Sequence, residues 1–127
     1  MLGIYFDAAH TDKLSESGAG TNPDITRLNG AVGGVEEKKL YVWNDNAAAK
    51  TYEEIYVTAA NDDEQFKVEY AADDAGAPGT FSDAISLPNG DFATAVPFWR
   101  RVTIAVQADS VTRRDIKHNL NAIEYAK

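Results

Sequence analysis

The sequence predicts an all-β protein, an antiparallel two-sheet sandwich of immunoglobulin-like type with about seven or eight strands. Helical periodicity is hard to find, short segments of alternating apolar and polar residues recur, and turn-forming residues bound most of these segments. A jelly roll or a small barrel is the competing architecture, because it is built from similar strands. At 127 residues we expect one sandwich over residues 25–127, preceded by an extended strand and flexible loop over residues 1–24.

The expected strands are short segments, and in most of them apolar residues recur at every second position. In chain order these segments are Leu2–Phe6, Ile25–Leu28, Val35–Trp43, Tyr52–Ala59, Phe66–Tyr70, Ala84–Leu87, Phe98–Val106 and Ile116–Tyr125. The last segment loses its alternation near Ala122, which predicts a bulge there.

The connections are rich in Gly, Asn, Asp, Ser and Pro, the residues that favour turns. Asp12–Asp24 and Ala71–Gly79 are expected to be loops, and Asp109–Asp115 either one helical turn or a loop. The triplet Asn44-Asp45-Asn46 is expected to form a corner between two strands. Leu40 and Val42 before this corner should then meet Ile55 and Val57 after it in the core.

Composition argues against several classes of function. The formal net charge is −8 and the basic residues form only short pairs, whereas nucleic-acid surfaces need basic stripes. The pairs Lys38-Lys39, Arg100-Arg101 and Arg113-Arg114 are expected at strand flanks or interfaces. No apolar run approaches the roughly 20 residues of a membrane helix, and the first residues do not have the pattern of a secretory signal. The absence of cysteine fits a reducing compartment and excludes disulfides and thiolate zinc sites.

Motifs of common enzyme sites are missing from the sequence. There is no G-x-S-x-G, no phosphate-binding G-x-x-x-x-G-K and no G-x-G-x-x-G. Adjacent acids such as Glu36-Glu37 point to opposite faces of a strand and cannot share a substrate. His10 and His118 lie in polar surroundings and are expected to be exposed. We therefore expect no catalytic residue, no cofactor and no metal.

Calcium is the metal for which the sequence offers some oxygen ligands. Asn and Asp gather at Asn44–Asn46, Asn61–Glu64 and Asn89–Asp91, but none of these matches the D-x-[DN]-x-[DN]-G-x5-E loop. The same residues are the usual ones in turns, so turn chemistry is the preferred interpretation and a bound ion the alternative.

Aromatic residues allow two further interpretations. Tyr41 and Trp43 share one strand face, and with Trp99 they could form a platform on which a sugar stacks. The preferred interpretation is that these rings pack in the core or in an interface with a partner, since large exposed apolar surfaces usually mark interfaces.

Several segments resemble small β-sandwich proteins encoded among the structural genes of tailed bacteriophages and related viruses. The segments that carry this resemblance are Ile4–Asp7, Asn22–Asp24, Asn29–Gly30, Gly33–Val42, Asn44-Asp45, Tyr52–Thr58 and Pro97–Val102. Trp43 departs from the pattern, which has a basic residue before the Asn. The same succession of strand, Asn-Asp corner and strand also occurs in immunoglobulin-like accessory domains of surface proteins and glycosidases.

The resemblance implies a virion component that decorates the capsid or belongs to the neck or tail. Its expected partners are the major capsid, portal, neck or tail proteins and further copies of itself, with no nucleic acid and no membrane. Residues 2–6 either form the first strand of the sandwich, which is preferred, or pair with a neighbour's sheet edge. A carbohydrate- or host-surface-binding module is the alternative function, followed by an enzyme accessory or calcium-dependent adhesion domain. The candidate partner-interface residues are Leu2, Ile4, Tyr5, Phe6, Tyr41, Trp43, Trp99, Arg100 and Arg101.

Overall fold

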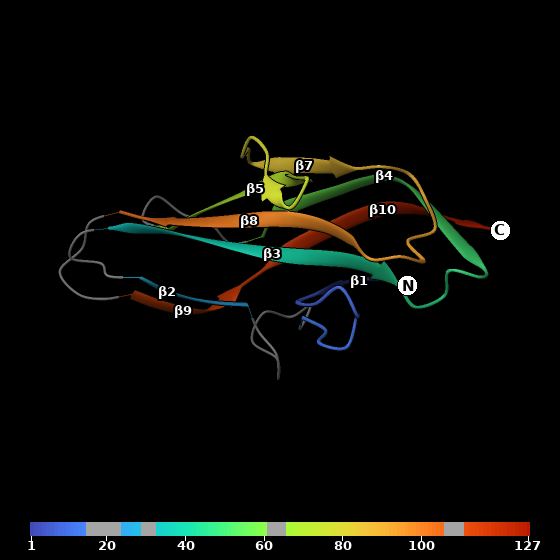
Figure 1. The fold of residues 1–127 in the computed structure, drawn as a ribbon, viewed down its shortest axis with the longest axis horizontal. Coiled ribbons are helices and arrows are strands. Elements are labelled where there is room, and N and C mark those ends of the chain that lie inside the picture. The colour runs from blue at the N-terminus through green and yellow to red at the C-terminus, as the bar shows by residue number, and fades with distance from the viewer. Residues whose placement is uncertain (15–23, 29–32, 61–65, 106–110) are drawn as a thin grey trace.

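A computed structural model describes residues 1–14, 24–28, 33–60, 66–105 and 111–127, which form an all-β fold without helices (Figure 1). No helix in these ranges is long and apolar enough to cross a membrane. The strands are β1 (Leu2–Tyr5), β2 (Asp24–Leu28), β3 (Gly34–Asn44), β4 (Lys50–Ala59), β5 (Phe66–Asp74), β6 (Ala77–Pro78), β7 (Ala84–Leu87), β8 (Val96–Ile104), β9 (Val111–Ile116) and β10 (His118–Ala126).

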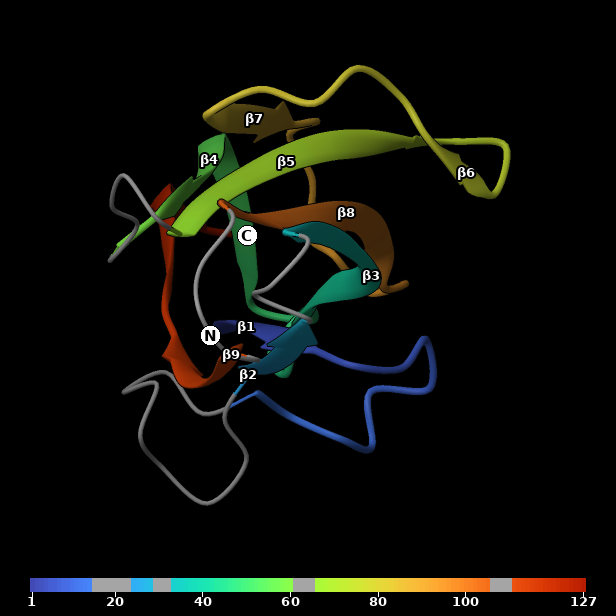
Figure 2. The same ribbon diagram turned by 90° about the vertical axis from the view of Figure 1, so that its left-hand side faces the viewer.

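Two antiparallel sheets form the body of the fold, which confirms the predicted all-β sandwich. The five-stranded sheet has the order β1-β3-β8-β5-β6, and the three-stranded sheet has the order β10-β4-β7. Figure 2 shows the curved strands β3, β8 and β5 on one side of the interior, with β4 and β7 above and beside them. A further pair, β2 and β9, lies beside the start of β3 (Figure 1). The immunoglobulin-like assignment itself stays a prediction.

The first strand pairs within the chain. β1 runs antiparallel to β3, with Leu2 opposite Asn44 and Tyr5 opposite Tyr41. This confirms the preferred prediction for residues 2–6, that they form the first strand of the protein's own sandwich. The flexible loop predicted after this strand lies mostly at residues 15–23, outside the described residues.

The C-terminal part of the chain differs from the prediction. Val111–Ile116 is strand β9, so the helical turn or loop expected over Asp109–Asp115 is wrong for the described part of that segment. Only Lys117 separates β9 from β10, and the two strands pair with different partners, β2 and β4. The pairing of β9 with β2 could not be inferred from either segment alone.

The loop predicted over Ala71–Gly79 is wrong, because most of it is a β-hairpin. β5 continues to Asp74, and β6 returns with Ala77 opposite Asp74. Ala75 and Gly76 between them have φ angles of 53° and 94°. Positive φ at both central residues is typical of a tight two-residue hairpin turn, which Gly76 favours.

The predicted bulge lies where it was expected, and its extra residue is on the neighbouring strand. The register between β10 and β4 shifts between Asn121 and Ile123. Opposite this point Glu54 has a φ of 52°, and both Glu53 and Glu54 are exposed. The extra residue changes the phase of β4, so that the side chains of Tyr52 and Ile55 both point into the core.

The hydrophobic core lies between the two main sheets. Leu40 and Val42 of β3 are 0% exposed, as are Ile55 and Val57 of β4, and all four belong to one cluster of buried residues. This confirms the predicted packing across the Asn44–Asn46 corner. β5 adds Phe66 and the other apolar residues of its inward face.

Candidate functional site

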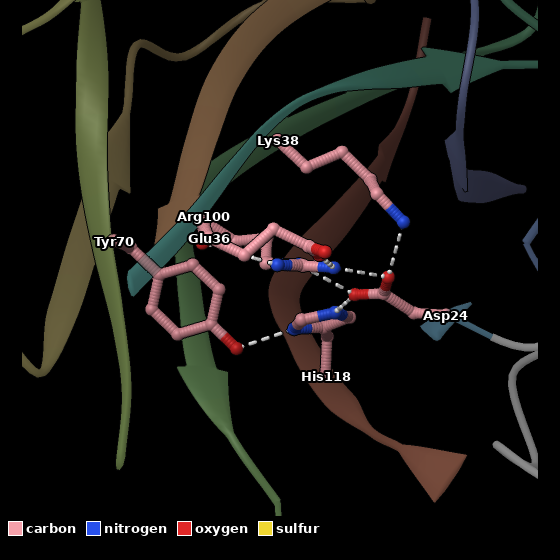
Figure 3. Close-up of polar contacts among 6 residues, drawn as sticks. All are labelled: Asp24, Glu36, Lys38, Tyr70, Arg100 and His118. Atoms are coloured by element: carbon pink, nitrogen blue, oxygen red, sulfur yellow. Dashed lines mark hydrogen bonds and ion pairs between the residues drawn. The ribbon is translucent and has the colours of Figure 1, made fainter. Parts of the chain in front are cut away.

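A cluster of charged and polar side chains lies beside β2, with a buried centre and two partly exposed members, Glu36 and Lys38 (Figure 3). Asp24 and Arg100 are 0% exposed, and so is the side chain of His118. The cluster gathers residues from β2, β3, β5, β8 and β10, namely Asp24, Glu36, Lys38, Tyr70, Arg100 and His118.

Strand alternation explains why these polar side chains point inward. Glu36 and Lys38 occupy the same face of β3 as the buried Leu40. Arg100 on β8 follows the buried Phe98 by two positions and therefore shares its inward face. The expectation that the Arg100-Arg101 pair lies at a strand flank or interface is wrong for Arg100, whose guanidinium is inside the fold.

The Asp24 carboxylate is the acceptor at the centre of the cluster. Arg100 donates to both of its oxygens, from Nε at 2.9 Å and from Nη2 at 2.8 Å. Lys38 Nζ donates to the same carboxylate at 3.0 Å, and His118 Nε2 lies 2.8 Å from Oδ2. Arg100 Nη2 also contacts Glu36 Oε1 at 2.8 Å. Asp24 thus ties β2 to the five-stranded sheet and to β10.

These contacts determine the charge of the central pair. Burial alone would raise the pKa of the Asp24 carboxyl, but the hydrogen bonds from His118 and Arg100 and the positive charge of Arg100 outweigh it and hold that pKa well below its usual range. Burial would lower the pKa of Arg100, but its hydrogen bonds and charge interactions with Asp24 and Glu36 raise it. Asp24 is therefore an anion and Arg100 a cation in the folded protein.

His118 connects this ion pair to a buried tyrosine. An ionised carboxylate only accepts hydrogen bonds, so Nε2 of His118 carries the proton directed at Asp24. In the neutral imidazole, Nδ1 then accepts the hydrogen bond that the Tyr70 hydroxyl donates. The prediction that His118 is an exposed surface histidine is wrong: its side chain is 0% exposed because β10 directs it toward the interior.

The cluster is suited to holding strands in place. The charges of Asp24 and Glu36 balance those of Lys38 and Arg100. Hydrogen bonds connect Asp24 through His118 to Tyr70, which is 0% exposed. A buried, mutually satisfied network of this kind fixes the relative positions of its strands.

A pocket of about 370 Å³ lies between β1 and β10, the edge strands of the two main sheets. Tyr52 reaches it from β4, and its hydroxyl donates to Glu124 Oε1 at 2.7 Å. Burial, followed by the hydrogen bond and the charge of Glu124, raises the pKa of Tyr52 to about 12. The pocket is lined by Met1, Leu2, Gly3, Ile4, Leu14, Tyr52, His118, Asn119, Leu120, Asn121, Ala122 and Glu124.

The outer face of the five-stranded sheet brings the predicted aromatic residues together. Tyr41 and Trp43 alternate with inward residues on β3, and Trp99 lies opposite Lys39 in the β3–β8 register. All three rings are half-buried. The Lys39 amine lies 5.7 Å from the centre of the Tyr41 ring and 5.9 Å from that of Trp99. Asp73 accepts a hydrogen bond from Trp99 Nε1 at 2.9 Å.

Trp43 is partly covered by the segment that follows β1. The His10 ring stacks on it in parallel, with centroids 3.7 Å apart, and Tyr5 meets its edge at 5.7 Å. Trp43 Nε1 also donates to the Ala93 carbonyl at 3.1 Å. His10 is exposed, as predicted, but its stacking on Trp43 was not foreseen.

The other candidate interface residues are divided between interior and surface. Leu2, Ile4 and Tyr5 are buried within the chain's own fold. Phe6 is half-buried, and the Lys38 amine lies 5.3 Å from its ring centre. The half-buried Arg101 donates to Glu69 Oε1 at 3.0 Å and lies 4.2 Å from the ring centre of Phe81.

Asn44, the first residue of the Asn44–Asn46 corner, uses its whole side-chain amide within the fold. Asn44 is 1% exposed, and its Oδ1 accepts hydrogen bonds from the Asn46 and Met1 nitrogens at 3.0 Å each. Its Nδ2 donates to the Lys50 and Asp91 carbonyls at 3.2 and 3.0 Å. These bonds support the corner interpretation.

No group of three or more His, Cys, Asp or Glu side chains in the described part of the chain is placed to hold a metal ion. The Asn61–Glu64 candidate lies outside those residues.

Comparison of the chain with models of protein families, with curated proteins and with solved structures finds no match.

Proposed function

We propose that this protein is a non-catalytic structural component of a tailed-virus particle that binds other virion proteins and acts in multiple copies. One observation carries the binding part of the proposal: the half-buried aromatic residues Tyr41, Trp43 and Trp99 lie together on the outer face of the five-stranded sheet. Such rings are typical of protein interfaces, where they contribute large contact areas. The virion setting is supported by the resemblance of the strand and corner pattern.

The buried cluster is compatible with this proposal. Its ion pair is enclosed, and the hydrogen bonds of Asp24 and His118 are made within the fold. A protein that works by binding needs rigid faces, and the cluster links β2, β8 and β10 while the charges of Asp24 and Arg100 stay inside the fold.

The experiment is quantitative protein analysis of virus particles purified by sedimentation from the source of the sequence. The protein should be present at a fixed ratio to the major capsid protein. In particles reconstituted with the Trp99→Ala variant, that ratio should fall, whereas Ser86→Ala, at an exposed position on β7 of the other sheet, should leave it unchanged. Particles that lack the protein would refute the proposal.

A carbohydrate-binding module is the second candidate, and one arrangement favours it. Tyr41 and Trp99 flank the Lys39 amine, and the Asp73 carboxylate lies 3.5 Å from that amine. Rings beside charged hydrogen-bonding groups can stack on a sugar and bond its hydroxyls. A glycan array should then show binding that Trp99→Ala abolishes, and an array without hits would exclude this candidate.

A further inference from the structure

β10 presents a long backbone edge that no other described strand pairs with. It is the end strand of the sheet β10-β4-β7. Ala60 N–H donates to the Lys117 carbonyl at 3.0 Å, and Lys127 N–H donates to the Ala49 carbonyl at 2.9 Å. Residues 117 and 127 therefore bond to the chain opposite, and in an antiparallel pair every second residue does the same. The odd-numbered residues of β10 on either side of the bulge thus bond to β4, and the even-numbered residues direct their backbone N–H and C=O groups away from it.

This edge lacks the features that usually prevent strand pairing. Natural edge strands are commonly short or carry lysine, proline or several charges. β10 is 9 residues long, HNLNAIEYA, without Lys, Arg or Pro and with Glu124 as its one acid. The chain as a whole has a formal net charge of −8, so its acids are concentrated elsewhere.

Exposed apolar side chains gather on the outer face of the same sheet. Tyr56, Ile123 and Tyr125 are 46%, 43% and 45% exposed. Tyr56 lies opposite Asn121 in the register, and Ile123 and Tyr125 follow on the same face of β10. Among described residues, the other large exposed hydrophobics are Met1 and Val35 on the five-stranded sheet's side of the fold.

The free side of β10 also borders the pocket. The five consecutive residues His118 to Ala122 all line it. Since neighbouring side chains of a strand point to opposite faces, the backbone edge itself must form part of the pocket wall. A strand added along β10 would therefore cover the opening between β10 and β1.

We propose that a second copy of this chain is the occupant and that two copies pair antiparallel through the free edges of β10. The three-stranded sheets would join across a two-fold axis, with Ile123 and Tyr125 of both copies on one face. In such a contact the same surface patch meets itself, so an excess of one charge on it would be repelled by the second copy, and the patch must carry few charges. β10 meets this condition, because its one carboxylate accepts the Tyr52 hydrogen bond at 2.7 Å.

This inference rests on one part of the proposed function, namely that the protein acts in multiple copies, because it names the contact through which those copies would meet. The two can fail separately. Self-association is measured on the isolated protein, and virion binding is measured on particles.

Sedimentation velocity of the full chain, from about 1 μM to about 1 mM, tests the pairing. We expect a monomer–dimer equilibrium that Ile123→Lys weakens by about tenfold, because like charges would face each other across the axis. Val35→Lys is the matched control, because it makes the same change of charge at an exposed strand residue away from β10. It should leave the equilibrium unchanged.

Hydrogen exchange of the unaltered protein gives a second measurement that needs no variant. The amides of Leu120 and Glu124 should become protected as concentration rises, while those of Asn119 and Asn121 are protected at every concentration. A protein that stays monomeric at about 1 mM would overturn the proposal. So would a dimer that both lysine variants weaken equally, or one that leaves the Leu120 and Glu124 amides unprotected.

Discussion

Replacing Asp24 with asparagine should destabilise the protein by about 3 kcal/mol, the lower end of the range for breaking a buried ion pair. Asp24 receives hydrogen bonds from Arg100, Lys38 and His118, and all the contacting atoms are donors. Asparagine keeps the size but offers one oxygen and an NH₂ group that would face donors. The lower end applies because Glu36 still contacts Arg100 at 2.8 Å and remains as a counter-ion.

Urea denaturation followed by tryptophan fluorescence measures this loss. Asp83→Asn is the matched control, because Asp83 also forms an ion pair, with Lys67 at 2.9 Å, but its side chain is 79% exposed. An exposed pair contributes about 0–1 kcal/mol. In a thermal melt of the same variants, the melting temperature should fall by roughly 10 °C for Asp24→Asn and by no more than a few degrees for Asp83→Asn.

Equal losses in the two variants would refute the assignment of Asp24 as the centre of the cluster. A double-mutant cycle sharpens the test. Once Arg100→Met has removed the cation, Asp24→Asn should cost clearly less than it does alone, because the partner left unpaired is already absent. Additive effects would show that the two side chains do not interact.

Three further outcomes follow from the same contacts. Because the pKa of Asp24 is lower in the folded than in the unfolded state, its contribution is complete above about pH 5 and is lost as the pH falls below about 4; Asp24→Asn should flatten that part of the stability curve. Tyr70→Phe leaves Nδ1 of the buried His118 without its donor and should cost about 1–3 kcal/mol in a urea titration. Glu54→Gly removes a side chain from a residue held at a φ of 52° and should stabilise the protein by roughly 0.5 kcal/mol, which a thermal melt would show as a slightly higher melting temperature. Glu53→Gly, the adjacent exposed residue, should instead lower it, and the opposite order would contradict the bulge geometry.

Alternation was sufficient to predict the apolar half of the interior. Leu40 and Val42 on one strand and Ile55 and Val57 on the next are close in sequence, and the inward faces of the two strands on either side of a short corner contribute to the same core. The strand β9 escaped prediction because its pairing with β2 joins Arg27 to Thr112, a contact that local pattern does not encode.

The buried cluster was missed for a different reason. Arg100 follows Phe98 by two positions, so the alternation in the sequence already placed it on the inward face of its strand. An arginine at such a position can nevertheless extend its guanidinium to the surface, so alternation alone did not predict burial. What fixes it inside is a carboxylate 76 positions away. The exposed environment expected for His118 came from its polar neighbours, whereas its actual partner, Asp24, lies in a distant strand.

The separation of these partners has a consequence for folding kinetics. Arg100 meets Glu36 across 64 positions, and His118 meets Asp24 across 94. Contacts this distant require large loops to close before they stabilise the fold, and chains rich in them fold in milliseconds to seconds. During synthesis, β2 cannot reach its final environment until His118 has left the ribosome. Until then, the Asp24 carboxylate, which is buried in the folded protein, stays exposed to solvent.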